Sequence, residues 1–380
     1  MFKKFSRRNI LKIITGGIFS TFKLLNANNK SLSSTYKRGK NMSGIINIVS
    51  LPEVGPWPTR DPFLFCVHHN DIYPSANKDL SPDATLDGRN IGQDFSNKDG
   101  WNMYHGDRVP GFPKHPHRGF ETLTVVDRGI IDHSDSLGAS ARYGEGDAQW
   151  LTAGDGINHA EMFPLFNLKD SNPIDFFQIW INLPSKNKRV SPHFSMFWDK
   201  DIPKVKSKDS KGISTEVKVV SGDYNSTKAC DPPPNSWARD EANNVAVWVI
   251  KIDKNGEWDV PINDNNILRS LYIPKGNKVT INNQKILPGN RIDLLPNHDV
   301  RVENLGKETK LLLLQGKPIK EPVVQYGPFV MNSKAEIQEA FNDYNQTKFG
   351  GWNWENSAPV HGYKKERFAK FIDGSVERPS

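Results

Sequence analysis

The chain has 380 residues, 36% of them hydrophobic and 24% charged, which suits a soluble globular protein of roughly two domains. Ten of its 50 Lys and Arg lie in residues 1–40, which hold no Asp or Glu. The rest of the chain has 40 basic and 43 acidic residues, so the net charge of +7 comes from the N-terminus and gives no indication of direct nucleic-acid binding. Only two cysteines, Cys66 and Cys230, are present, which excludes a disulfide framework and a cysteine-based zinc site.

The N-terminus has the order of a secretory signal, with a basic segment at residues 1–12 and an apolar run at residues 13–22. The run is too short to span a bilayer as a helix. Residues 6–12, with Arg7-Arg8, resemble a twin-arginine export signal, so we expect export to the periplasm. The alternative is a cytoplasmic protein with a basic tail, because residues 25–27 form a poor cleavage site. We assign residues 1–44 to signal and linker.

Many short apolar runs follow, separated by 29 glycines and 26 prolines, which predicts an all-β fold. We expect one β-rich half at residues 45–183 and a second at residues 184–380. The Lys-rich residues 200–212 are predicted to form a solvated loop between strands. Candidate strands cover residues 63–68, 121–127, 147–152, 176–183, 217–221, 245–252, 269–273, 278–281, 291–295 and 309–314.

A single helix is predicted near the C-terminus. Ser333 and Glu336 form a capping box, and Gly350-Gly351 can end the element. Apolar residues between these points follow helical spacing and are expected to pack on a barrel: Ile337, Ala340, Phe341 and Tyr344.

Two short motifs in the first half carry metal-binding chemistry. His115-Pro116-His117 places two imidazoles on one face of a strand, and His159-Ala160-Glu161 does the same for an imidazole and a carboxylate. If the two strands lie opposite each other, His115, His117, His159 and Glu161 meet at one point. This set suits Fe(II), Mn(II), Ni(II), Cu(II) or Zn(II) and leaves coordination positions open for a substrate.

Other candidates rank lower. Glu121 competes with Glu161 for the carboxylate position, and we expect it to be a supporting or structural residue instead. His133 is predicted to lie on the surface or in a loop. His68 and His69 are neighbours on a strand and cannot both be ligands. His193, His298 and His361 stand alone and are expected to be structural. The second half has no comparable motif, so we predict one metal site per chain.

Four long segments resemble the pirin family of bicupins. HPHRGFET at residues 115–122 and QWLTAGDGINHAEM at residues 149–162 are similar to the signature segments of that family. DPFL at residues 61–64 and EPVVQYGPFVMN at residues 321–332 also match. The resemblance covers roughly residues 45–350.

The resemblance implies two stacked cupin barrels of the jelly-roll type, with iron in the N-terminal barrel. It implies the ligands His115, His117, His159 and Glu161. Some bacterial members are quercetin 2,3-dioxygenases, and a mammalian member is a nuclear, iron-dependent transcriptional cofactor. The chain departs from the family in its leader, at Cys66-Val67-His68-His69 and at residues 125–128. These departures leave the proposed ligands unchanged, but they do not determine the identity of the substrate.

Three functions follow as hypotheses. The first is an iron-dependent dioxygenase for a flavonol-like, quercetin-type substrate, in which Glu161 is both ligand and catalytic base. The second is a non-enzymatic iron or redox sensor that acts through a protein partner. The third is another cupin activity, such as an isomerase. In each case we expect a monomer with no membrane span.

Overall fold

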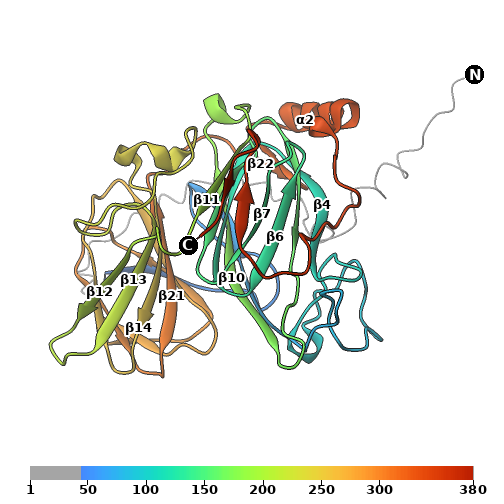
Figure 1. The fold of residues 1–380 in the computed structure, drawn as a ribbon. Coiled ribbons are helices and arrows are strands. Elements are labelled where there is room, and N and C mark those ends of the chain that lie inside the picture. Colours follow the sequence, from blue (N-terminus) through green and yellow to red (C-terminus); the bar gives the residue numbers. More distant parts are fainter. Residues whose placement is uncertain (1–43, 380) are drawn as a thin grey trace, which may run out of the picture.

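The computed structural model describes residues 44–379, so the predicted export signal lies outside the described part. Two β-barrels stand side by side (Figure 1). The first is built from two six-stranded sheets that face each other. One sheet has the order β11 (His193–Phe197), β8 (Ala148–Thr152), β5 (Phe120–Arg128), β10 (Asn172–Asn182), β3 (Phe63–Tyr73) and β2 (Trp57–Pro58). The other has the order β25 (Val376–Glu377), β24 (Phe368–Lys370), β7 (Ser140–Gly144), β6 (Ile130–Asp135), β9 (Ile157–Met162) and β4 (Gly111–His117).

The second barrel pairs a seven-stranded sheet with a four-stranded one. The larger sheet has the order β1 (Ile45–Ser50), β19 (Asn290–Leu294), β16 (Leu268–Ile273), β21 (Thr309–Gly316), β14 (Ala246–Ile252), β13 (Ser214–Ser221) and β12 (Lys204–Lys208). The smaller sheet has the order β15 (Glu257–Val260), β20 (Val300–Asn304), β17 (Val279–Ile281) and β18 (Gln284–Ile286). A two-stranded ribbon follows, β22 (Val324–Tyr326) and β23 (Phe329–Met331). The predicted all-β fold with two cupin barrels is confirmed.

The two barrels share a core because some strands are buried on both faces. In β10, Phe176 packs inside the first barrel, whereas Phe177 and Ile179 join the layer between the barrels. In β14, Trp248 packs inside the second barrel and Val247 faces the same layer. Side chains alternate along a strand, so burial on both faces produces the nearly continuous apolar runs seen in the sequence.

Strand pairing departs from the expected division at residues 183/184. The first strand, β1, pairs with β19 and belongs to the second barrel. Strand β11 pairs with β8, and the late strand β24 pairs with β7, so both belong to the first barrel. Each barrel therefore contains strands from both halves of the chain, because a strand joins whichever edge can satisfy its backbone hydrogen bonds.

Two local predictions have different outcomes. Helix α2 (Lys334–Thr347) starts at Ser333, whose hydroxyl accepts a hydrogen bond from the Glu336 backbone N–H at 3.2 Å, so the capping box is confirmed. The helix ends at Thr347, before Gly350-Gly351, because Lys348 adopts a left-handed backbone conformation. Residues 200–212 were predicted as a loop, which is wrong for the edge strand β12, and its exposed lysines discourage pairing with another chain.

The described residues hold both cysteines, and each is a free thiol. Residues 44–379 contain no helix with the length and apolar character needed to cross a bilayer.

Candidate metal centre

The two predicted motifs lie on neighbouring strands of one sheet. Strands β4 and β9 are antiparallel, with His115 directly opposite His159. The two strands therefore lie opposite each other as hydrogen-bonded neighbours within one sheet. Residues paired across adjacent strands point to the same face, so side-by-side strands bring the side chains together over a shorter distance. An irregularity between Phe112 and His115 then sets Glu161 opposite Phe112.

The three imidazoles form a compact group. One ring nitrogen from each of His115, His117 and His159 lies within 4.8 Å of the other two. His117 and His159 are buried, and His115 is half-buried at the edge of the sheet. His115 is therefore the most exposed of the three.

Burial disfavours the charged form of all three imidazoles. Burial lowers the pKa of His115 to about 4 and places the pKa values of His117 and His159 well below their ordinary range. His115 Nδ1 donates to the Pro113 carbonyl at 2.9 Å, which leaves its Nε2 as the free lone pair. Within residues 44–379, neither ring nitrogen of His159 has a hydrogen-bond partner although both are buried. Buried polar atoms of this kind call for a partner, and a metal ion suits three neutral imidazoles.

Glu161 lies beside this group. Its Oε2 is 4.0 Å from His159 Nε2, and its side chain is 3% exposed. Gln178 Nε2 donates to Oε2 at 2.8 Å, and the Thr124 hydroxyl donates to Oε1 at 3.4 Å. Burial raises the pKa of Glu161, opposed by the nearby His133 and by these two donors.

Comparison with known proteins addresses the family. The family model described as Pirin matches residues 58–181, and the model described as Pirin C-terminal cupin domain matches residues 247–350. The chain belongs to the pirin family. It is 35% identical to human Pirin over 255 residues, which is 65% of this chain and 80% of that protein. It is 36% identical to Pirin-1 of Arabidopsis thaliana over 245 residues, 63% of this chain and 78% of that protein.

Among solved structures, this pirin-family chain is similar to a quercetin 2,3-dioxygenase from Acinetobacter baumannii. The TM-score is 0.63 at 25% identity, and the match covers 81% of this chain and 98% of the other. The structures thus agree over both barrels.

The second carboxylate candidate of this pirin-family chain faces away from the histidines. Glu121 lies on β5, where odd-numbered residues point to the layer between the barrels. The Thr152 hydroxyl donates to it at 2.7 Å and the Ser236 hydroxyl at 2.6 Å. Burial raises the pKa of Glu121 to about 7, against the effect of these hydrogen bonds. The structure therefore places Glu161, and not Glu121, beside His159, while the compact group itself consists of the three histidines.

The prediction for His133 is wrong, because this side chain is fully buried. It lies on β6 with its backbone opposite Glu161, and its ring centroid is 5.6 Å from that of His159. Its Nε2 is 3.2 Å from Asp135 Oδ2, and its ring stacks on Phe194. The alternation of Ile131 and His133 was a signal that His133 shares a face with a core residue.

The other histidines lie outside the group of three. His68 and His69 point to opposite faces of β3, as predicted. His68 Nε2 is 2.9 Å from Asp175 Oδ1, whereas His69 stacks on Phe176 inside the barrel. His361 Nε2 lies 2.7 Å from the His133 carbonyl, and His193 is exposed.

Residues 328–330 lie against the turn that follows His117. Arg118 exchanges backbone hydrogen bonds with this segment, donating to Pro328 and accepting from Val330. Gly119 sits against the Val330 carbonyl at a φ of +84°, where a Cβ would lie 2.0 Å from that oxygen. Glycine is therefore required in the HPHRGFET turn by close backbone approach.

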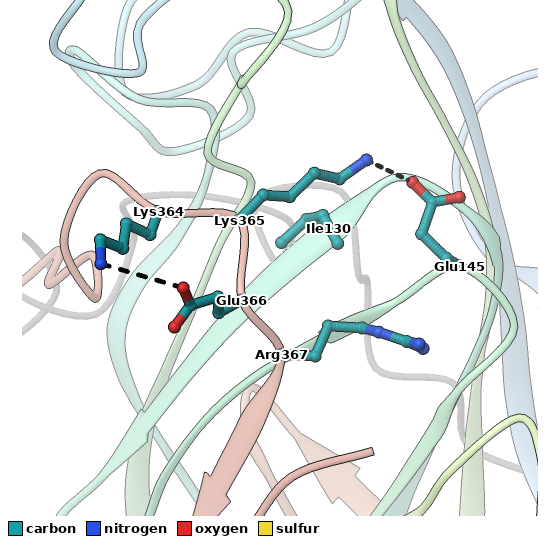
Figure 2. Close-up of a pocket in the computed structure, with 6 residues that line it drawn as sticks. All are labelled: Ile130, Glu145, Lys364, Lys365, Glu366 and Arg367. Carbon is teal, nitrogen blue, oxygen red and sulfur yellow. Dashed lines mark hydrogen bonds and ion pairs between the residues drawn. The ribbon is translucent and has the colours of Figure 1, made fainter. Parts of the chain in front are cut away.

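An open surface pocket of 520 Å³ lies elsewhere, on the outer side of the first barrel. Figure 2 shows the side chains of residues 364–367 around it, with Lys365 reaching Glu145 and Lys364 reaching Glu366. None of the four proposed ligands lines it: its residues are Ile130, Glu145, Lys364, Lys365, Glu366 and Arg367.

Proposed function

We propose that the first barrel holds one divalent transition metal, iron in the cell, and that the chain is a dioxygenase for a flavonol-like substrate. The proposed ligands are His115, His117, His159 and Glu161. The observation that carries the proposal is the meeting of three uncharged imidazoles, with unpartnered buried ring nitrogens, beside a carboxylate. The similarity to a quercetin 2,3-dioxygenase structure supports the substrate class.

A divalent metal held by these residues supplies Lewis-acid polarisation of a substrate oxygen and redox capacity toward dioxygen. The chain itself supplies orientation and proton transfer. Glu161 is the proposed acceptor for the hydroxyl proton of the substrate, since its carboxylate lies 4.0 Å from His159 Nε2. We expect a substrate to reach the group past His115 and Gln178, which are both half-buried.

The test is consumption of dioxygen and release of carbon monoxide with quercetin after iron loading. We expect turnover in the wild type and loss of turnover in His115→Ala. Equal activity in the two proteins would remove the dioxygenase proposal. Elemental analysis of protein purified from its own host identifies the metal, and an ion other than iron would overturn that part of the proposal.

A second candidate function is an iron or redox sensor that acts through a protein partner. The burial of His117, His159 and Glu161, each at most 3% exposed, favours this candidate because little of the group is open to a substrate. Pull-downs with the Fe(II) and Fe(III) forms distinguish the two functions. A partner captured in one oxidation state supports the sensor, and capture in neither state counts against it.

We also propose export to the periplasm through the twin-arginine-like leader at residues 6–12. An export route for folded proteins would allow a metal to be loaded before translocation. Sequencing the N-terminus of the mature protein tests this proposal. Protein that keeps Met1 and fractionates with the cytoplasm would contradict it.

A further inference from the structure

Gln178 lies across the first barrel from the histidines. It is on β10, in the sheet that faces β4 and β9, and its side chain is half-buried. Its amide Nε2 donates to Glu161 Oε2 at 2.8 Å. This hydrogen bond therefore joins the two sheets beside the proposed ligands.

The bond restrains one particular oxygen of Glu161. Oε2, which accepts from Gln178, is also the oxygen that lies 4.0 Å from His159 Nε2. The other oxygen, Oε1, has only the longer 3.4 Å contact from Thr124. A Glu side chain has several rotamers, and a buried carboxylate oxygen that loses its donor is strongly destabilised. Gln178 is thus the stronger of the two restraints on where the carboxylate sits.

We propose that Gln178 is a positioning residue that holds Glu161 beside the three imidazoles and so determines whether this carboxylate completes the ligand set. The inference rests on the metal site proposed above. Groups that orient a ligand without touching the metal typically change metal affinity by about 10- to 100-fold when removed. Gln178 is such a group for Glu161.

A purely structural role is the competing explanation, in which Gln178 only satisfies a buried carboxylate. That role would change stability and leave the metal environment as it was. The chain offers a matched control, because Gln149 on β8 also flanks Thr124 across the sheet and is fully buried. Its amide oxygen accepts from the Tyr143 hydroxyl at 3.5 Å and not from a residue of the proposed site.

The experiment measures Co²⁺ binding to the full chain by titration and by visible absorption, which reports the number and type of ligands. We expect the wild type to bind Co²⁺ and Gln178→Met to bind it about 10- to 100-fold more weakly with altered absorption bands. Gln149→Met is expected to match the wild type in both readouts. The melting temperatures of the metal-free proteins are measured first, so that Co²⁺ binding is compared at a temperature at which every variant is folded.

The outcomes separate the two proposals. If the wild type does not bind Co²⁺, the metal site itself is refuted. If the wild type binds and Gln178→Met gives the same affinity and spectrum, the metal site stands and the positioning role of Gln178 is overturned. Should Gln178→Met fail to fold, Gln178→Asn keeps the amide and shortens it by one methylene, and the same changes are expected; an unchanged spectrum would again overturn the role.

Discussion

The two barrels share one architecture and differ in what fills them. In the first barrel, the inward faces of β4 and β9 present histidines and a glutamate. In the second, the small sheet presents apolar side chains to the interior, among them Trp258, Val279, Ile281, Val300 and Val302. The comparison teaches that the fold does not set the chemistry; a few inward side chains do, and the inward side chains of the small sheet in the second barrel serve packing.

The largest effect is expected from His159→Ala. This change removes the most enclosed of the three imidazoles, whose ring nitrogens have no partner within residues 44–379. We expect near-stoichiometric divalent metal in the wild type and loss of stable binding in the variant, measured by elemental analysis after dialysis. His193→Ala is the control, since this histidine of the same barrel is exposed. Equal metal content in His159→Ala and wild type would break the contrast between the barrels.

The next effect concerns the second barrel. Leu311 is fully buried among apolar side chains on β21, so Leu311→Ala leaves a cavity. We expect the free energy of unfolding to fall by about 2–5 kcal/mol, as measured by urea denaturation. Metal content of the folded variant should equal that of the wild type. Loss of metal from a folded Leu311→Ala protein would show that the second barrel does more than pack.

A pH effect is expected at Glu121, between the barrels. Its pKa is raised to about 7 by burial, so in the range from about 4.5 to 7 the folded protein binds more protons than the unfolded chain. This contribution to stability is therefore present at pH 4.5 and is lost as pH rises through 7. Glu121→Gln stays neutral, so we expect its melting temperature relative to wild type to be higher at pH 8 than at pH 5. A difference that does not change with pH would argue against a protonated Glu121.

The smallest effect is expected at the edge of the second barrel. Lys206 on β12 is 72% exposed and lies 3.4 Å from Glu216. Exposed ion pairs of this kind contribute about 0–1 kcal/mol, so Lys206→Ala should leave the urea midpoint nearly unchanged. A loss well above about 1 kcal/mol would mean that this edge strand holds the sheet together more strongly than its exposure suggests.

Much of the site was predictable because its motifs are local. His115 and His117 share a strand face, and so do His159 and Glu161, whatever strands lie beside them. The burial of His133 was missed, although the core residue Ile131 two positions earlier indicated the strand face that His133 shares. Gln178 was missed too, since nothing near it in the chain shows that it reaches Glu161 across the barrel.

The sequence by itself determined the alternation of the strands, the start of helix α2 at Ser333, the family and the pairing of ligand types within each motif. These depend on residues a few positions apart, where backbone geometry dictates which side chains share a face. Only the tertiary structure decided that β4 lies next to β9, that β1 and β24 cross to the other barrel, and that Gln178 meets Glu161. These contacts depend on which distant strand edges and buried polar groups form hydrogen bonds with each other. Such long-range pairing produces no pattern among residues that are close in the sequence.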